Sequence, residues 1–292
     1  MIKVMEAFRL PKRASTSGDV GIEIEVEGDN LPRPDEYWRC ERDGSLRGES
    51  MEYVLEEPLK LPKALDALAH LDACYIRGNT NVHESVRAGV HIHINVQKLT
   101  VVELFSFMTA YLILEDLLIK YCGEYREGNL FCLRTRDAEF LLHTLEGVAS
   151  KKNYEAFSSD MLRYASMNVC SLWRYGSLEF RAMRGTRDLA IVGEWASILL
   201  NLRNVAVKFE SPAHIIEVLQ QDGPESFLET FLGTSKEKVC NGIDCNELVN
   251  DGLYRAYQLA VSTGWDSFTI KSIGGLLFPT DVEFPDAPME DF

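Results

Sequence analysis

The sequence lacks both of the glycine-rich loops that most often hold nucleotide phosphates. Neither G-x-x-x-x-G-K-[ST] nor G-x-G-x-x-G occurs in its 292 residues. In such loops the backbone N–H groups surround the phosphate oxygens. Any nucleotide bound by this chain must therefore be held by metal ions and arginine side chains.

Paired cysteines are missing as well. The chain has seven cysteines, an odd number, and none of them forms a Cys-x-x-Cys pair. This spacing argues against a zinc ribbon and against a disulfide scaffold. We expect reduced thiols packed in the core, as in a cytoplasmic protein.

Basic residues are few, with 30 Lys and Arg against 45 Asp and Glu, a formal net charge of −15. So much negative charge disfavours non-specific binding to nucleic acid or to anionic lipid. It still allows an anionic substrate such as a nucleotide, provided that arginines or a divalent metal supply local positive charge.

Long apolar runs without charge are also absent. The most apolar long segment, residues 101–121, contains Glu103, Glu115 and Asp116 and predicts a buried amphipathic helix rather than a membrane span. The first residues, MIKVMEAFRLPKR, have no long apolar stretch, so we expect no secretory signal.

The hydrophobic patterning that is present predicts an α+β protein. Alternation typical of strands occurs in 20–28, 51–55, 88–96 and 166–184, the last as a hairpin turning near Tyr175-Gly176. Asp43-Gly44 is a turn signal before the strand at 51–55. Helical spacing occupies 61–74, 101–121, 136–149 and, from Asp188, several segments up to 262.

Regular alternation of strands and helices is missing, so we expect a mainly antiparallel sheet rather than a doubly wound parallel one. The predicted organisation is a single domain over 1–280. Its sheet motifs lie in 20–187 and its helical part in 188–280, and an acidic tail follows at 281–292.

Each predicted strand has one apolar face and one face that carries chemistry. The polar faces carry the following residues: Glu23, Glu25 and Glu27; Glu52; His91, His93 and Asn95; Ser177, Glu179 and Arg181. Taken singly, each face could be solvated or, for Glu179 and Arg181, form a structural ion pair. If the strands are neighbours in one sheet, the same residues form a carboxylate and imidazole site for Mg²⁺ or Mn²⁺. Arg181, Arg184 and Arg187 would lie beside it as phosphate ligands.

This order of motifs resembles the glutamine synthetase and glutamate–cysteine ligase superfamily, and most closely its amidoligase branch of carboxylate–amine ligases. The branch has Glu-x-Glu on a first strand, as in GIEIE, and a glutamate on a later strand, as Glu52 in SMEYVLEEP. A Gly-x-His-x-His strand follows, as in GVHIH, and then Glu-x-Arg, as in LEFRAMRGT. An upstream Asn is matched by Asn168. The resemblance covers about residues 20 to 187.

The resemblance implies a role for each matching position. The implied metal ligands for two or three Mg²⁺ ions are Glu23, Glu25, Glu52, His91 and Glu179. The implied contacts to the nucleotide and the transferring phosphate are His93, Asn168, Arg181 and Arg184. Catalytic roles fall on Arg181, His93 and Glu52.

The resemblance also implies a fold and a reaction. The fold is an antiparallel sheet curved into a half-barrel like the glutamine synthetase catalytic domain, with helices on its convex side. In the reaction, ATP phosphorylates a carboxylate, and an amine attacks the acyl phosphate to give an amide. The partners would be ATP, a carboxylate and an amine on an amino acid, peptide or protein side chain, and a homo-oligomer is compatible with this.

The sequence motifs are also compatible with other functions. A phosphagen-type guanidino kinase would use the same half-barrel, a metal-dependent hydrolase would use the same ligands, and an interaction protein would use none of them. The base that deprotonates the amine is unassigned, with Asp43 and Glu49 as candidates from their place near the predicted turn.

Overall fold

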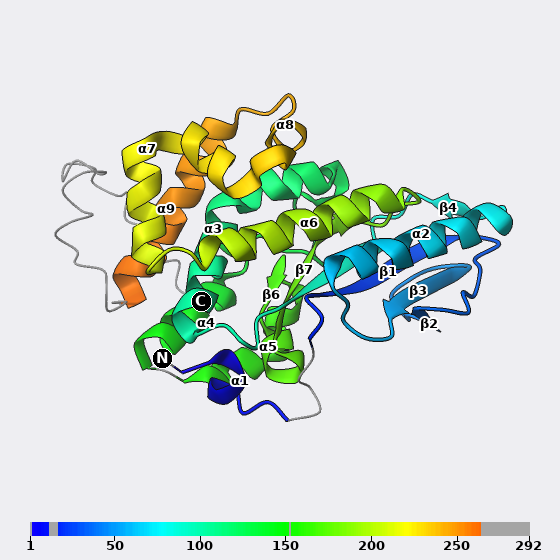
Figure 1. Ribbon diagram of the computed structural model, residues 1–292, viewed down its shortest axis with the longest axis horizontal. Coiled ribbons are helices and arrows are strands. Elements are labelled where there is room, and N and C mark those ends of the chain that lie inside the picture. Colours follow the sequence, from blue (N-terminus) through cyan, green and yellow to red (C-terminus); the bar gives the residue numbers. More distant parts are fainter. Residues whose placement is uncertain (1, 12–16, 152, 264–292) are drawn as a thin grey trace, which may run out of the picture.

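The computed structural model describes residues 2–11, 17–151 and 153–263. The chain forms an α+β structure with a seven-stranded sheet (Figure 1). The strands are β1 (Val20–Asp29), β2 (Trp38–Glu41), β3 (Ser50–Leu55), β4 (Asn81–His83), β5 (Gly89–Asn95), β6 (Met167–Asn168) and β7 (Ser177–Arg184). The helices are α1 (Val4–Ala7), α2 (Leu61–Arg77), α3 (Val101–Cys122), α4 (Glu139–Lys151), α5 (Cys170–Tyr175), α6 (Leu189–Ala206), α7 (Pro212–Leu232), α8 (Lys236–Val239) and α9 (Cys245–Thr263).

The strand order is β2-β3-β1-β5-β7-β6, and β4 pairs with the far end of β1. Every strand pairing is antiparallel. The predicted class and the antiparallel sheet are therefore confirmed. The half-barrel form implied by the resemblance remains an expectation.

One face of the sheet is covered by helices. Ile22, Ile24 and Ile92 are almost completely buried on that face, and Phe180 packs its ring against Tyr111 of α3, with 4.7 Å between centroids. Helices α2 and α6 lie side by side along the sheet, while α3, α7 and α9 form the helical half of the molecule (Figure 1). Burial of alternate apolar residues holds each strand to the helices and turns the polar residues to the other face.

The connection between β6 and β7 differs from the prediction. The two strands pair as expected, with Asn168 opposite Glu179, but they are joined by the short helix α5 rather than by a tight turn. The Asn168 side chain accepts from the N–H of Cys170, the first residue of this helix. Gly176, with φ of 68°, ends it in the left-handed region. The hydrogen bond from Cys170 to the Asn168 side chain favours a helical connection over the predicted tight turn.

Several other expectations can be compared with the structure. Asp43-Gly44 lies in the loop between β2 and β3, as the turn signal predicted. Helix α7 is kinked at Gly223, which has φ of 80° and precedes Pro224. All seven cysteines are free thiols, and Cys74, Cys122 and Cys132 are buried. Every helix in the described part of the chain is too short or too polar to cross a bilayer. The predicted tail at 281–292 lies outside the described residues.

Candidate functional site

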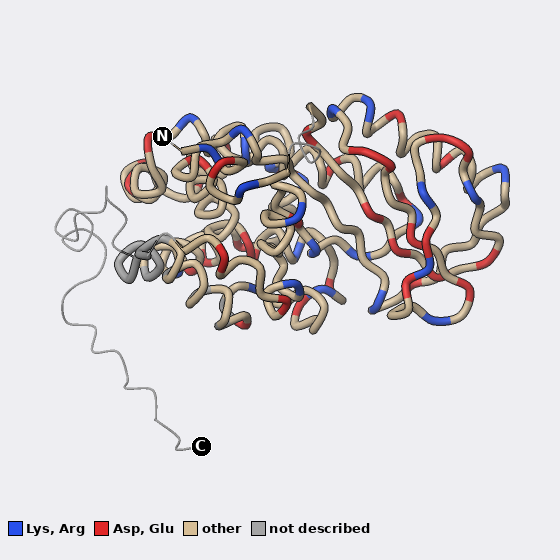
Figure 2. The backbone as a smooth tube through the Cα atoms, turned by 90° about the horizontal axis from the view of Figure 1, so that it is seen from below, with Lys and Arg blue, Asp and Glu red and all other residues tan. Residues whose placement is uncertain are grey.

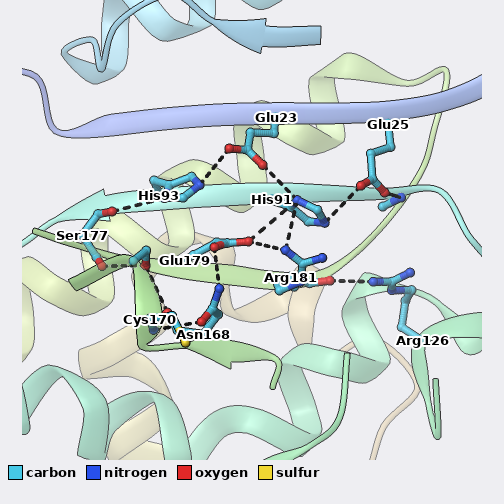
Figure 3. Close-up of polar contacts among 12 residues, drawn as sticks. Glu23, Glu25, His91, His93, Arg126, Asn168, Cys170, Ser177, Glu179 and Arg181 are labelled. Atoms are coloured by element: carbon cyan, nitrogen blue, oxygen red, sulfur yellow. Dashed lines mark hydrogen bonds and ion pairs between the residues drawn. The ribbon is translucent and has the colours of Figure 1, made fainter. Parts of the chain in front are cut away.

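Strand register brings the predicted site residues together on the face that the helices do not cover (Figure 3). Glu23 of β1 lies directly opposite His91 of β5, and Glu25 lies opposite Glu52 of β3. His93 of β5 lies opposite Glu179 of β7. Asp and Glu residues recur along the part of the chain that carries β1, β2 and β3 (Figure 2). The period of two thus aims side chains from neighbouring strands at one place.

Glu23 stands between the two histidines. Its Oε2 lies 3.1 Å from Nδ1 of His91, and its Oε1 lies 3.2 Å from Nε2 of His93. Burial by itself raises the pKa of Glu23, but the hydrogen bonds and charge of both rings outweigh it and hold that pKa well below its ordinary value. Burial lowers the pKa of His93, yet its bond to Glu23 and the charge of Glu179 leave that pKa raised. The Nδ1 of His93 lies 3.1 Å from the hydroxyl of Ser177, which orients the ring.

Glu179 is held at both carboxylate oxygens. The amide nitrogen of Asn168 donates to Oε2 at 2.7 Å, and Arg181 donates to Oε1. Glu179 is only 6% exposed, and burial raises its pKa. The charges of His93, Arg181 and His91 more than offset this, so the pKa of Glu179 is lowered and the side chain is an anion. Asn168 uses both ends of its amide within the protein, at Glu179 and Cys170, and therefore positions Glu179.

A second group of carboxylates adjoins this one. Glu25 is buried, accepts from the N–H of Gly89 at 2.9 Å and lies 3.8 Å from Nε2 of His91. Burial raises the pKa of Glu25. Burial and the charges of Glu23 and Glu25 raise the pKa of Glu52 to about 7. Asp43, in the β2–β3 loop, also faces Glu25, and its bonds from Ser45 hold its pKa low against the effect of burial.

The raised pKa of Glu52 leads to a stability prediction. Its ionisation disfavours the folded state; this cost is absent below pH 4.5 and complete above about pH 7. After a discount for solvent screening we expect about 1 kcal/mol, so Glu52→Gln should raise the melting temperature at pH 8 by about 2–4 °C without divalent ions. Thermal denaturation at pH 8 and pH 5 measures this. An equal gain at both pH values would contradict the assigned cause.

A β-bulge sets the position of Arg181. Val90 pairs with Met183 and Ile92 pairs with Phe180, so Arg181 and Ala182 together face the single residue His91. The guanidinium of Arg181 consequently contacts Glu179 and lies 3.5 Å from Nδ1 of His91.

Four residues of the expected site lie away from this cluster: Glu27, Glu49, Arg184 and Arg187, of which Arg187 pairs with Asp72 of α2. Arg184 donates to the carbonyl of Cys122 at 3.0 Å and lines a cavity of about 1030 Å³ between α2, α6 and residues 123–125. Glu49, a candidate base, is exposed.

A smaller cavity of about 380 Å³ adjoins the cluster itself, with Glu23, His93, Ser177 and Tyr175 in its wall. We associate the chemistry with this smaller cavity, because it reaches Glu23 and His93 and the larger one reaches neither.

The cluster fits a divalent cation. Ligand atoms of Glu23, His93 and Glu179 lie within 4.8 Å of one another. Two carboxylates with one imidazole are donors that suit Mn²⁺ and Mg²⁺ better than a soft metal. The sequence predicted His91 as a metal ligand and His93 as a phosphate contact. The structure instead groups His93 with the carboxylates of Glu23 and Glu179. It places His91 between Glu23 and Arg181.

Two supporting features escaped the sequence analysis. Arg126 donates to the carbonyls of Arg181 and Ala182, and nothing in its irregular surroundings signals this contact. Glu115 of α3 is fully buried and accepts from Ser166, two residues before Asn168. It also accepts two bonds from Thr135, at 2.9 Å each. This anchors β6, and with it Asn168, to the helical half.

Residues 59–201 match the family model described as "Putative amidoligase enzyme". This range contains His91, His93, Asn168, Glu179 and Arg181, whereas Glu23, Glu25 and Glu52 precede it and reach the site through strand pairing. No curated protein matches the chain.

Proposed function

We propose, from the assignment of this chain to the putative amidoligase family, that it is an ATP- and Mg²⁺-dependent carboxylate–amine ligase that works through an acyl phosphate. The family match supports an amide-forming ligase. The observation that carries the finer proposal is the convergence of Glu23, His91, His93, Glu179 and Arg181 from three adjacent strands. Phosphoryl transfer needs charge neutralisation and positioning more than covalent help, and this cluster offers both.

In this proposal the carboxylates hold the metal ions. Glu23, Glu179 and His93 would hold one Mg²⁺, and Glu25 and Glu52 would contribute to a second position beside it. Bound Mg²⁺ would neutralise phosphate charge during transfer and polarise the phosphoryl oxygens. The mutual repulsion that raises the pKa of Glu52 would be relieved by such ions, which is the usual reason for gathering like charges.

The remaining residues have roles that follow from their contacts. Arg181 would stabilise charge on the transferring phosphate, because its guanidinium is already held at the cluster by Glu179. His91 would orient Glu23 through the contact between its Nδ1 and the Glu23 carboxylate. Of the two candidate bases for the amine, Asp43 is favoured over Glu49, since Asp43 faces Glu25 at the cluster and Glu49 is exposed.

Isotope transfer tests the proposal directly. The protein is incubated with ATP, Mg²⁺, a panel of amines and carboxylates labelled with ¹⁸O on the carboxyl group. A ligase that forms an acyl phosphate moves one ¹⁸O from the carboxylate into inorganic phosphate and releases ADP with the amide. Unlabelled phosphate accompanying amide formation would contradict the acyl phosphate.

The same assay separates the alternatives. A guanidino kinase would form ADP and a phosphorylated guanidinium with no amide. A metal-dependent hydrolase would act without ATP. Absence of ADP formation with every pair, while Mn²⁺ still binds as measured by calorimetry, would remove the ligase proposal and leave the metal site.

A further inference from the structure

Arg126 is a buried cation behind the candidate site. It ends the short 3₁₀ helix Glu124–Arg126 that follows α3, and it is 2% exposed. Gly123, with φ of 120°, turns the chain from α3 into this segment. The Nε of Arg126 donates to the carbonyl of Ala182 at 3.0 Å, and its Nη2 donates to the carbonyl of Arg181 at 2.6 Å. Both acceptors are main-chain oxygens of the β-bulge, and Figure 3 shows the contact with the carbonyl of Arg181.

These two carbonyls need a partner because the bulge interrupts the ladder between β5 and β7. A planar guanidinium has donors in a fixed fork and can serve two adjacent carbonyls at once. Arg126 thereby fixes the backbone on which Arg181 stands. The side chain of Arg181 in turn contacts Glu179 and His91.

The charge of Arg126 is costly where it lies. Among the described residues no carboxylate comes within ion-pair distance of it, and its buried Nη1 has no hydrogen-bond partner there. A buried cation that is compensated by carbonyl dipoles alone, without a counter-ion, opposes folding, so a purely structural clamp would be better made by a neutral side chain. A positive charge behind Arg181 instead adds to the potential that an anionic phosphate would meet.

Gly89 makes room for this arrangement. A Cβ at Gly89 would lie 3.2 Å from Nη2 of Arg126 and 3.5 Å from Nε2 of His91. The separation from Arg126 is tight for a methyl group, and the separation from His91 is an ordinary van der Waals contact. The glycine that opens the Gly-x-His-x-His pattern is therefore the residue that lets Arg126 and His91 approach from two sides.

We propose that Arg126 is a positioning residue for the phosphate-binding arginine, acting through the carbonyls of Arg181 and Ala182. This inference rests on the proposed function for its kinetic readout and on geometry alone for its structural readout. It predicts that loss of Arg126 lowers turnover while the metal position formed by Glu23, His93 and Glu179 is retained, because Arg126 contacts none of the three.

The test is a double-mutant cycle on ADP formation with Arg126→Met, Arg181→Gln and the combination. We expect Arg126→Met to lower kcat by about 10–100-fold, as for other residues that orient a site through a neighbour. The KM for ATP should stay within about twofold. The Mn²⁺ affinity should not fall and should rise in the same direction as in Arg181→Gln, since Glu179 is released from Arg181. In the Arg181→Gln background the same change should cause no further loss, since the two act as one unit. Independent, additive losses would overturn the proposal.

Two further variants address folding. Arg134→Met removes a half-buried arginine of the same segment, paired with Asp116 and Asp137, and should lower stability without changing kcat. If Arg126→Met fails to fold, Gly89→Ala displaces the guanidinium without removing its charge. We expect it to lower kcat by about 3–10-fold, which is less than the loss expected when a group that orients a ligand is removed altogether. Unchanged turnover in a folded Gly89→Ala protein would contradict the proposal.

A structural readout keeps the two proposals separate. If the wild-type protein forms no ADP, the ligase proposal fails. The positioning role of Arg126 is then tested by a crystal structure of Arg126→Met. If Arg126→Met does not fold, a crystal structure of Gly89→Ala is used. Departure of the Arg181 guanidinium from Glu179 supports the positioning role. An unmoved Arg181 with an intact bulge overturns it.

Discussion

Glu23→Gln is expected to abolish Mg²⁺-dependent ADP formation, with a loss of about 10³-fold or more. Glu23 offers one oxygen to each of the two histidines and belongs to the candidate metal position. The neutral amide cannot neutralise a divalent cation, and metal-ion stabilisation of the transferring phosphate is worth several kcal/mol, where each 1.36 kcal/mol is tenfold in rate. ADP release by a coupled assay measures the turnover, and calorimetry with Mn²⁺ measures the binding.

The matched control is Glu27→Gln, four residues along the same strand. Glu27 is half-buried like Glu23, but its carboxylate accepts from the N–H of Arg47 at 2.8 Å and lies toward β4. This variant should keep both turnover and Mn²⁺ affinity. Wild-type ADP formation in a folded Glu23→Gln protein would rule out the proposed metal position.

Arg181→Lys should have an effect of similar size on turnover with a different signature. Lysine keeps the charge but lacks the planar fork, and an arginine that stabilises phosphoryl transfer is worth about 10³–10⁵ in kcat. We expect kcat to fall by about 10³-fold and the KM for ATP to change by only a few-fold. Steady-state kinetics at saturating Mg²⁺ provides both values.

Metal affinity separates loss of the Arg181 charge, tested by Arg181→Gln, from loss of the Glu23 charge. Arg181 neutralises Glu179 in the protein without metal, so Arg181→Gln should leave that carboxylate a better ligand and strengthen Mn²⁺ binding, whereas Glu23→Gln weakens it. Arg163→Lys, at an exposed arginine that stacks on Tyr164, is the control and should match the wild type. Parallel weakening of Mn²⁺ binding in the Glu23 and Arg181 variants would contradict separate roles.

Much of the site could be read from local periodicity. Alternation in GIEIE, GVHIH and LEFR determined which side chains share a face, because a strand turns successive residues to opposite sides. It follows that Glu23, His91 and Glu179 could be proposed together before any strand pairing was known. Closeness in sequence grouped Arg184 and Arg187 with Arg181, but the structure puts Arg184 and Arg187 at the larger cavity.

The irregular parts of the site were not predictable in this way. The bulge in β7 adds one residue opposite His91, and no local pattern in LEFRAMRG marks it. Asn168 appeared as a nucleotide contact, but its side chain is engaged by Glu179 and Cys170. Arg126 lies 55 residues from Arg181 in a segment without periodic spacing. Contacts of this kind depend on which segments meet in three dimensions.

The sequence by itself determined the α+β class, the antiparallel character of the sheet and the chemical identity of each strand face. These follow from spacing within about ten residues, which backbone geometry converts directly into side-chain direction. Only the tertiary structure decided which strands are neighbours, which histidine joins Glu23 and Glu179, and which buried arginine holds the bulge. Those outcomes result from burial and charge compensation between distant segments, and these energies exist only once the chain has folded.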